Sequence, residues 1–109
     1  MFALADALPQ PYQRSLADQL RRAALSIPTN IAEGSGRESG KEQAYYYGVA
    51  KGSTYEVVSL LAMIGKRGQL GREQYQQHYQ EADEIAAMLS GLVKAVSAKA
   101  SYQSEDWPR

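Results

Sequence analysis

The sequence of 109 residues contains no cysteine, a single histidine and no long hydrophobic run. The lack of cysteine excludes disulfides, thiolate zinc sites and thiol catalysis, and it fits a reducing compartment. The most apolar stretch, residues 57–64, is far shorter than the roughly 20 residues that span a bilayer. The N-terminus also lacks the basic leader of a secretory signal. We therefore expect a soluble, cytoplasmic protein with no cofactor and no membrane contact.

The sequence also lacks an excess of charge of either sign, with twelve basic and twelve acidic residues. Zero net charge argues against a protein that coats nucleic acid by bulk electrostatics. The charge is uneven, however, because residues 1–72 carry a net +3 and residues 73–109 a net −3. This asymmetry favours contacts between the two parts, either within one subunit or between subunits.

Large apolar side chains are scarce. Leu, Val, Ile, Met and Phe together number 23, against sixteen alanines. A chain so rich in alanine buries little surface per residue, which favours close helix packing and a partner subunit. Its length fits one domain, which we place at residues 1–100.

Helical spacing of the apolar residues dominates, and no segment alternates as a half-buried strand does. We expect a short helix within residues 1–8, a helix from residue 12 to Gly34, and helices over about 40–66 and 72–100. Residues 101–109 read as a frayed tail. The predicted fold is an all-α, up-down antiparallel helical bundle of the four-helix type, with a short first helix and three long ones.

Several residues predict local features of these helices. Pro28 predicts a kink, or a break after which Ser26 caps a restarted helix. Ser39 and Glu42 have the spacing of a capping box. Gly48 and Gly52 lie inside a helix, where glycine costs up to about 1 kcal/mol relative to alanine, so we expect another backbone to approach them closely. In the last helix a seam repeats at steps of three and four, and further apolar residues widen it enough to contact two neighbours: Ile85, Met88 and Leu92.

Catalytic and metal-binding patterns fail on inspection. Residues 34–41 superficially resemble a phosphate-binding loop, but their glycine spacing fits neither the Walker nor the dinucleotide pattern. We interpret them as an interhelical turn, with a weak anion site at the next helix N-terminus as the alternative. Di-iron bundles carry a Glu-x-x-His motif on each of two helices, whereas this chain has one such pair, His78 and Glu81, in the reverse order. We therefore interpret this pair as part of a polar patch. The sequence therefore predicts no enzyme, no metal and no small-molecule substrate.

The tyrosines suggest an interface. Three consecutive tyrosines on a helix fan over about 200°, so they cannot all face one core. Tyr47 fits the internal stripe, and its two neighbours must point elsewhere. Tyrosine is enriched at protein interfaces. The candidate oligomer interface therefore comprises Tyr45, Tyr46, Tyr75 and Tyr79, and the alternative is a set of rim tyrosines on a monomer.

The basic residues form a second candidate surface. Arg14, Arg21 and Arg22 flank the apolar stripe of their helix, and Arg37 and Lys41 lie near a turn. These five residues are the candidate contacts for RNA or DNA phosphates. The alternative is a solvated face that pairs with the acidic last helix of the same or another subunit.

The central segment resembles a known signature. It comprises Ser26, Ile27, Pro28, Asn30, Ile31, Glu33 and Gly34, followed by Arg37, Ser39 and Glu42. It is similar to the bacterial four helix bundle protein family, which includes proteins encoded in intervening sequences of large-subunit ribosomal RNA genes. The accessory variability determinant of diversity-generating retroelements is a relative. The resemblance covers about residues 12–98.

The resemblance implies a small four-helix bundle, assembled as a homopentamer, with a non-enzymatic role. It implies a long first helix where this sequence has eight residues before Pro9, so we expect a short helix or a partner in its place. The retroelement relative binds nucleic acid and a reverse transcriptase through a basic surface.

The seven signature residues have a structural interpretation. We expect Asn30 to satisfy the carbonyl freed by Pro28 or to cap a restarted turn, and Glu33 to pair with Arg22 or Arg37. The functional expectation is a non-catalytic, oligomeric interaction protein. A nucleic-acid-binding accessory protein is the alternative, and a different protein is a further candidate partner.

Overall fold

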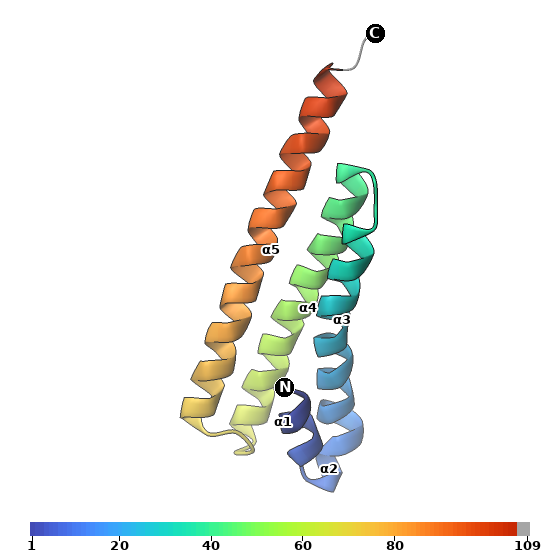
Figure 1. The fold of residues 1–109 in the computed structure, drawn as a ribbon. Coiled ribbons are helices and arrows are strands. Elements are labelled where there is room, and N and C mark those ends of the chain that lie inside the picture. Colours follow the sequence, from blue (N-terminus) through green and yellow to red (C-terminus); the bar gives the residue numbers. More distant parts are fainter. Residues whose placement is uncertain (107–109) are drawn as a thin grey trace.

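The computed structural model describes residues 1–106, with side chains described through residue 99. Its helices are α1 (Phe2–Ala7), α2 (Gln10–Tyr12), the π-helical turn η1 (Gln13–Ala17), α3 (Asp18–Ser35), α4 (Gly40–Lys66) and α5 (Arg72–Asp106). Because α2, η1 and α3 follow one another directly, they form one helical segment (Figure 1). Over residues 1–106 the chain has no strand, so the predicted all-α bundle with a short first helix and three long ones is confirmed.

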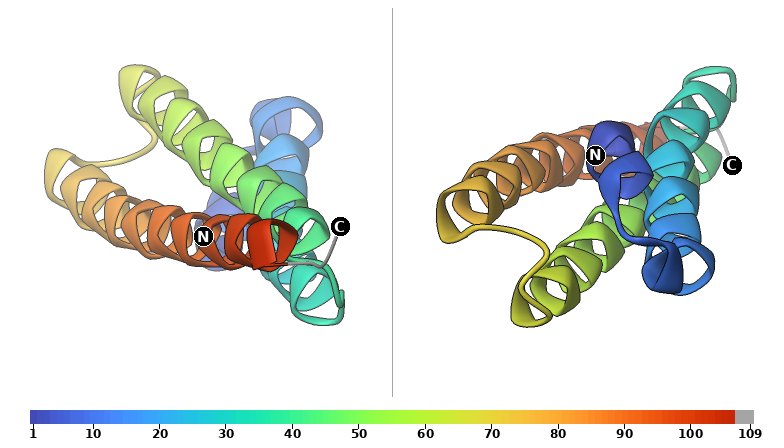
Figure 2. Two further views of the ribbon diagram at one scale, coloured as in Figure 1. Left: turned by 90° about the horizontal axis from the view of Figure 1, so that it is seen from above. Right: turned by 90° about the horizontal axis from the view of Figure 1, so that it is seen from below.

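The central helix is α4, which packs against α3 on one side and α5 on the other. Viewed along the bundle, α3 and α5 diverge from α4, and α1 lies in the angle between them (Figure 2). Because α1 has only six residues, it covers one end of this angle. The long α5 continues past the turn that joins α3 to α4 (Figure 1).

Two apolar clusters form the core. The larger one lies at the α1 end and joins α1, η1, α3, α4 and the turn before α5. The smaller one lies farther along α4 and α5 and has three buried members, Tyr47, Ala50 and Leu89. The larger cluster consists of Ala5, Leu8, Leu16, Ala17, Leu20, Ala23, Val57, Leu60, Leu61, Ile64 and Leu70.

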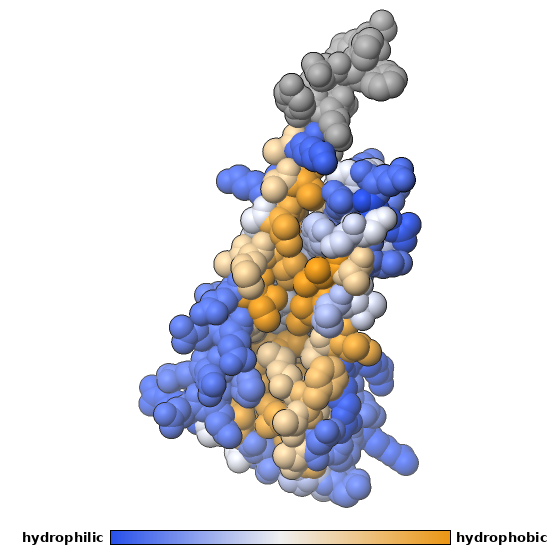
Figure 3. Space-filling view, in the orientation of Figure 1, coloured by the Kyte–Doolittle hydropathy of each residue, from blue (hydrophilic) through white to orange (hydrophobic). Residues whose placement is uncertain are grey.

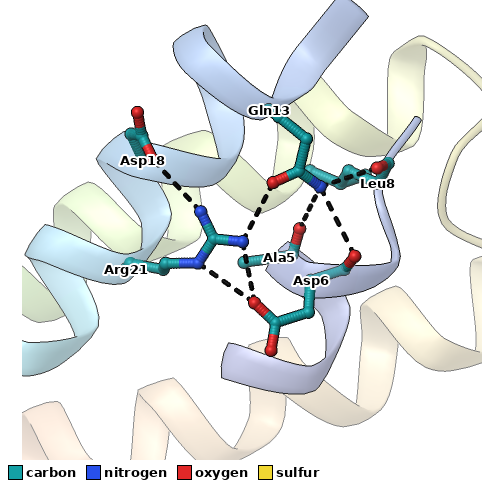
Figure 4. A network of polar contacts seen from close by, with 6 residues as sticks. All are labelled: Ala5, Asp6, Leu8, Gln13, Asp18 and Arg21. Atoms are coloured by element: carbon teal, nitrogen blue, oxygen red, sulfur yellow. Dashed lines mark hydrogen bonds and ion pairs between the residues drawn. The ribbon is translucent and has the colours of Figure 1, made fainter. Parts of the chain in front are cut away.

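Polar contacts tie α1 to the following helix (Figure 4). Leu8 ends α1 in an extended conformation, as expected for a residue that precedes proline. The Gln13 side-chain amide donates to the carbonyls of Ala5 and Leu8 at 2.9 and 2.7 Å, so it satisfies groups at the end of α1. Arg21 forms ion pairs with Asp6 at 2.7 Å and Asp18 at 3.1 Å.

Of the two alternatives for Pro28, a kink or a break, the break does not occur, because α3 is continuous from Asp18 to Ser35. Ser26 therefore caps no restarted helix. Instead, the Asn30 amide donates to the carbonyl and hydroxyl of Ser26 at 2.8 and 2.9 Å. The Thr29 hydroxyl donates to the Leu25 carbonyl at 2.8 Å. The carbonyl that Pro28 leaves without an N–H donor is that of Ala24, and neither side-chain bond reaches it, so the expectation that Asn30 satisfies the freed carbonyl is wrong.

The expectation for the two helix-interior glycines is also wrong. An ideal Cβ at Gly48 or Gly52 would meet no atom within 4 Å, so no described backbone approaches them. The close approach occurs at Gly34, where a Cβ would lie 2.9 Å from Tyr47 Cε1 and 3.0 Å from Tyr46 Cβ. Gly34 therefore lets the end of α3 pack directly on α4.

The turns follow their sequence signals. The Ser39 hydroxyl accepts the Glu42 N–H at 3.3 Å, which supplies one of the two bonds of the predicted capping box. Gly68, in the connection between α4 and α5, has a φ of 75° and so occupies the left-handed region. Helix α5 continues to Asp106, beyond its predicted end near residue 100, so residues 101–106 are helical. The rest of the predicted tail, 107–109, lies outside the described residues.

Candidate functional site

The second half of α5 is apolar around most of its circumference. Among residues 85–99, only Lys94 and Lys99 are charged. Leu89 is buried, but Met88 is 64% exposed and Leu92 42% exposed. A helix that is apolar on all sides is normally buried on all sides. Here only part of its surface is covered.

Within the described chain α5 has one extensive helix neighbour, α4. Over the described residues no helix other than α4 contacts α5 extensively, so the second neighbour expected for Ile85, Met88 and Leu92 is not found there. Figure 3 shows an apolar strip that runs between α5 and α3 beyond α1. Four half-buried apolar residues of α3 and α5 pack on the smaller core cluster: Ile31, Ile85, Val93 and Val96.

A second feature lies at the turn between α3 and α4, where basic and aromatic side chains meet. The Arg37 guanidinium donates to Tyr46 Oη at 3.1 Å and lies 4.9 Å from the centre of that ring. The Tyr45 ring meets Tyr46 edge-on at 5.2 Å between centroids and remains 66% exposed. With Lys41 and Glu42 these residues line a cavity of about 560 Å³.

The predicted basic surface is divided between two places. Arg14, Arg21 and Arg22 lie near the start of α3, and Arg37 and Lys41 lie at its far end, about 20 Å away along the helix axis. Arg21 is paired with two aspartates, and Arg37 pairs with Glu33 at 3.2 Å. Among the described residues no ion pair joins α3 or α4 to α5, so the expected pairing with the acidic last helix does not occur within one subunit.

The predicted tyrosine interface is divided in the same way. Tyr45 and Tyr46 lie near the start of α4, whereas Tyr75 and Tyr79 lie near the start of α5, at the opposite end of the bundle. The Tyr75 and Tyr79 rings are 6.1 Å apart. Tyr75 is half-buried against the larger core cluster, and Tyr79 is 47% exposed. The four residues therefore form two pairs at opposite ends of the bundle.

Residues 1–91 match the family model of the 23S rRNA-intervening sequence protein. The chain belongs to this family. The match confirms the resemblance inferred from the central segment, and it also includes the short first helix. No curated protein matches the sequence.

Three of the signature residues, Ile27, Ile31 and Gly34, pack against the core or α4. Ile27 and Ile31 pack against the larger and the smaller core cluster, respectively. Gly34 contacts Tyr47, and Glu33 pairs with Arg37, which was one of its two expected partners. Pro28 lies on the exposed side of α3. The signature thus coincides with the contacts that shape α3.

Ser53 is a residue whose role sequence reasoning missed. Its hydroxyl donates to the Ser26 hydroxyl at 2.8 Å and joins α4 to the signature of α3. Ser53 is nearly buried, so this bond replaces hydration that the hydroxyl loses on folding. The sequence offered two signals: Ser53 is a small polar residue on the apolar side of its helix, and the Gly52-Ser53 pair continues the family resemblance.

The last polar candidates from the sequence are His78 and Glu81. His78 Nδ1 lies 3.7 Å from Glu81 Oε2 on one face of α5. Across the part of the chain that the structure describes, no group of three or more His, Cys, Asp or Glu residues is arranged to hold a metal ion. No helix in that part is long and apolar enough to cross a membrane.

Proposed function

We propose that this chain is a non-catalytic, cytoplasmic interaction protein that acts as a homo-oligomer. The observation that carries the proposal is the apolar second half of α5. It packs extensively on one helix, whereas its apolar residues are numerous enough to contact two. Transfer of exposed apolar surface out of water contributes about 25 cal/mol per Å². The partly exposed Met88 and Leu92 would gain this term in an assembly.

The charge distribution elsewhere on the chain also favours a second copy as the partner. The first half of α5 carries exposed acidic residues, Glu73, Glu81, Asp83 and Glu84, and η1 and the start of α3 carry exposed Arg14 and Arg22. Each copy thus offers both signs, and opposite charges across an interface favour encounter and register. The family resemblance implies five copies, which for a chain of 12.0 kDa gives an assembly of about 60 kDa.

Light scattering coupled to size-exclusion chromatography tests the assembly. We expect about 60 kDa for the unmodified protein and a smaller species for Met88→Glu/Leu92→Glu, because two carboxylates would lose hydration in the interface. Gln76→Glu/Gln80→Glu is the matched control, since it adds the same charges at the same spacing on exposed positions of α5. Circular dichroism checks that both variants are folded.

Two results would contradict the assembly proposal. One is a monomer of 12 kDa across micromolar to millimolar concentrations. The other is equal dissociation by the two double variants, which would place the interface elsewhere. An assembly whose mass corresponds to a number of chains other than five would agree with the proposed interface but contradict the pentamer.

Nucleic-acid binding is a second candidate function, favoured by the cavity at the α3–α4 turn. The Tyr45 ring has an open face and meets the Tyr46 ring edge-on. Tyr46 in turn accepts a hydrogen bond from the Arg37 guanidinium. Bases of single-stranded RNA stack on such faces. Because Arg37 is paired with Glu33, Lys41 supplies most of the uncompensated positive charge. We therefore expect the protein to contact one or two phosphates of the RNA, and not a long series of them.

Fluorescence anisotropy with a labelled single-stranded RNA of twelve nucleotides tests this function. We expect Tyr45→Ala to weaken binding by about 5- to 150-fold, which corresponds to 1–3 kcal/mol per stacked base. Tyr45→Phe should retain binding. The slope of log affinity against log salt should be about −0.7 to −1.4. Tyr55→Ala is the control, because Tyr55 is 55% exposed on α4 and also follows a lysine by four positions. No binding at 50 mM salt, or equal losses for both alanine variants, would contradict the site.

A further inference from the structure

A cavity lies where α4 ends and α5 begins, at the opposite end of the bundle from the α3–α4 turn. Its volume is about 370 Å³, and its lining comes from α4, the connecting turn and the start of α5. Cavities that hold small molecules range from about 300 to 1,000 Å³. The lining residues are Ala62, Gly65, Lys66, Leu70, Arg72 and Tyr75.

Gly65 contributes no side chain to the lining of this cavity. It is the penultimate residue of α4, in the last turn before the connection to α5. A Cβ at Gly65 would meet no atom within 4 Å, so no packing contact of the described chain requires glycine there. Because Gly65 lines the cavity, a side chain at this position would occupy part of that space.

The cavity combines an apolar wall with a positive rim. Leu70 is 7% exposed, and Tyr75 is half-buried beside it in the lining. Lys66 and Arg72 are exposed at the edge, and over residues 1–99 neither forms an ion pair. Arg72 is also the first residue of α5, so the positive end of that helix dipole adds to the field.

We propose that this cavity binds a small organic anion, specifically a carboxylate carried on an aromatic or branched aliphatic body. The Arg72 guanidinium provides paired N–H donors that match a carboxylate, and Lys66 adds a second positive charge. The apolar body of the ligand lies against Leu70 and the Tyr75 ring, in the space left by Gly65. The cavity is built within one subunit, so this inference does not depend on the proposed assembly or on RNA binding.

Nuclear magnetic resonance with benzoate as the probe tests the site on the full chain in its own assembly state. Glycine amides resonate apart from most others, and the chain has glycines at the cavity and away from it. We expect benzoate to shift the amides of Gly65 and Gly71 in a saturable way and to leave those of Gly48 and Gly91 in place. Benzamide, which has the same ring without the charge, should bind at least tenfold more weakly.

Two variants separate the cavity from general surface binding. Gly65→Leu should weaken benzoate binding at least tenfold by filling the space, and Arg72→Gln should remove the preference for benzoate over benzamide. Gly52→Leu is the matched control, because Gly52 lies in the same helix and also has no atom within 4 Å of its Cβ position. It should bind benzoate as the unmodified protein does.

Three results would overturn the proposal. They are the absence of saturable shifts up to 20 mM benzoate, unchanged binding by a folded Gly65→Leu protein, and equal shifts at Gly48 and Gly65. The apolar strip along α5 is an alternative site for an aromatic probe. Loss of binding in Met88→Glu/Leu92→Glu, with retention in Gly65→Leu, would assign the probe to that strip and overturn the cavity site.

Discussion

Replacing Leu61 with alanine is expected to lower the free energy of unfolding by about 2–5 kcal/mol. Leu61 is fully buried in the larger core cluster, which joins α4 to α1, α3 and the turn before α5. Removing its methyl groups loses their transfer free energy and leaves a cavity that helices on several sides cannot all close. Urea denaturation followed by circular dichroism measures the change, at one fixed subunit concentration because assembly adds to apparent stability.

Leu25→Ala is the control for this measurement. Leu25 is 58% exposed on α3, so the same chemical change there should cost less than about 0.5 kcal/mol. Equal costs at the two positions would show that the larger cluster is not the main core. A cost for Leu25 above that for Leu61 would place the outer side of α3 in an interface.

Gly34→Ala is expected to destabilise the protein by up to about 3 kcal/mol net. Overpacking costs about 1–3 kcal/mol, and the better helix propensity of alanine returns up to about 1 kcal/mol. The added Cβ would lie within 3.0 Å of both Tyr46 and Tyr47, and Tyr47 is only 6% exposed. Since Tyr46 also bonds Arg37, the strain should spread to the cavity at the α3–α4 turn.

Gly48→Ala is the matched substitution with the opposite expected sign. Its Cβ would meet nothing within 4 Å, so only the helix propensity term acts, and stability should rise by up to about 1 kcal/mol. Thermal and urea unfolding of both variants give the comparison. A loss of stability at Gly48 would indicate that another subunit approaches α4 there.

The boundaries of the helices were largely predictable because their signals are local. The Ser39 cap and the glycines after Lys66 mark the two ends of α4, and Arg72 begins α5 where predicted. Pro9 ends α1 through the extended residue before it. The break considered for Pro28 does not occur: α3 continues through it, and Ile27 and Ile31, which precede and follow Pro28 in sequence, pack on the larger and the smaller core cluster.

The candidate surfaces were less predictable because residue type does not give position in the bundle. Five basic residues and four tyrosines were identified as surfaces, and the fold divides each set between opposite ends. Arg21 was also expected to be available, yet Asp6 and Asp18 neutralise it. Both carboxylates are visible in the sequence, but Asp6 reaches Arg21 only after α1 folds back on α3.

The sequence by itself determined the helical bundle, its short first helix, the family and the excess of apolar surface on α5. These follow from spacing and composition, which act over a few residues or over the whole chain. The tertiary structure decided which glycine permits a close contact, which charges are paired and where cavities form. Those properties depend on atoms brought together from separate positions, such as Gly34 with Tyr47 or Asp6 with Arg21.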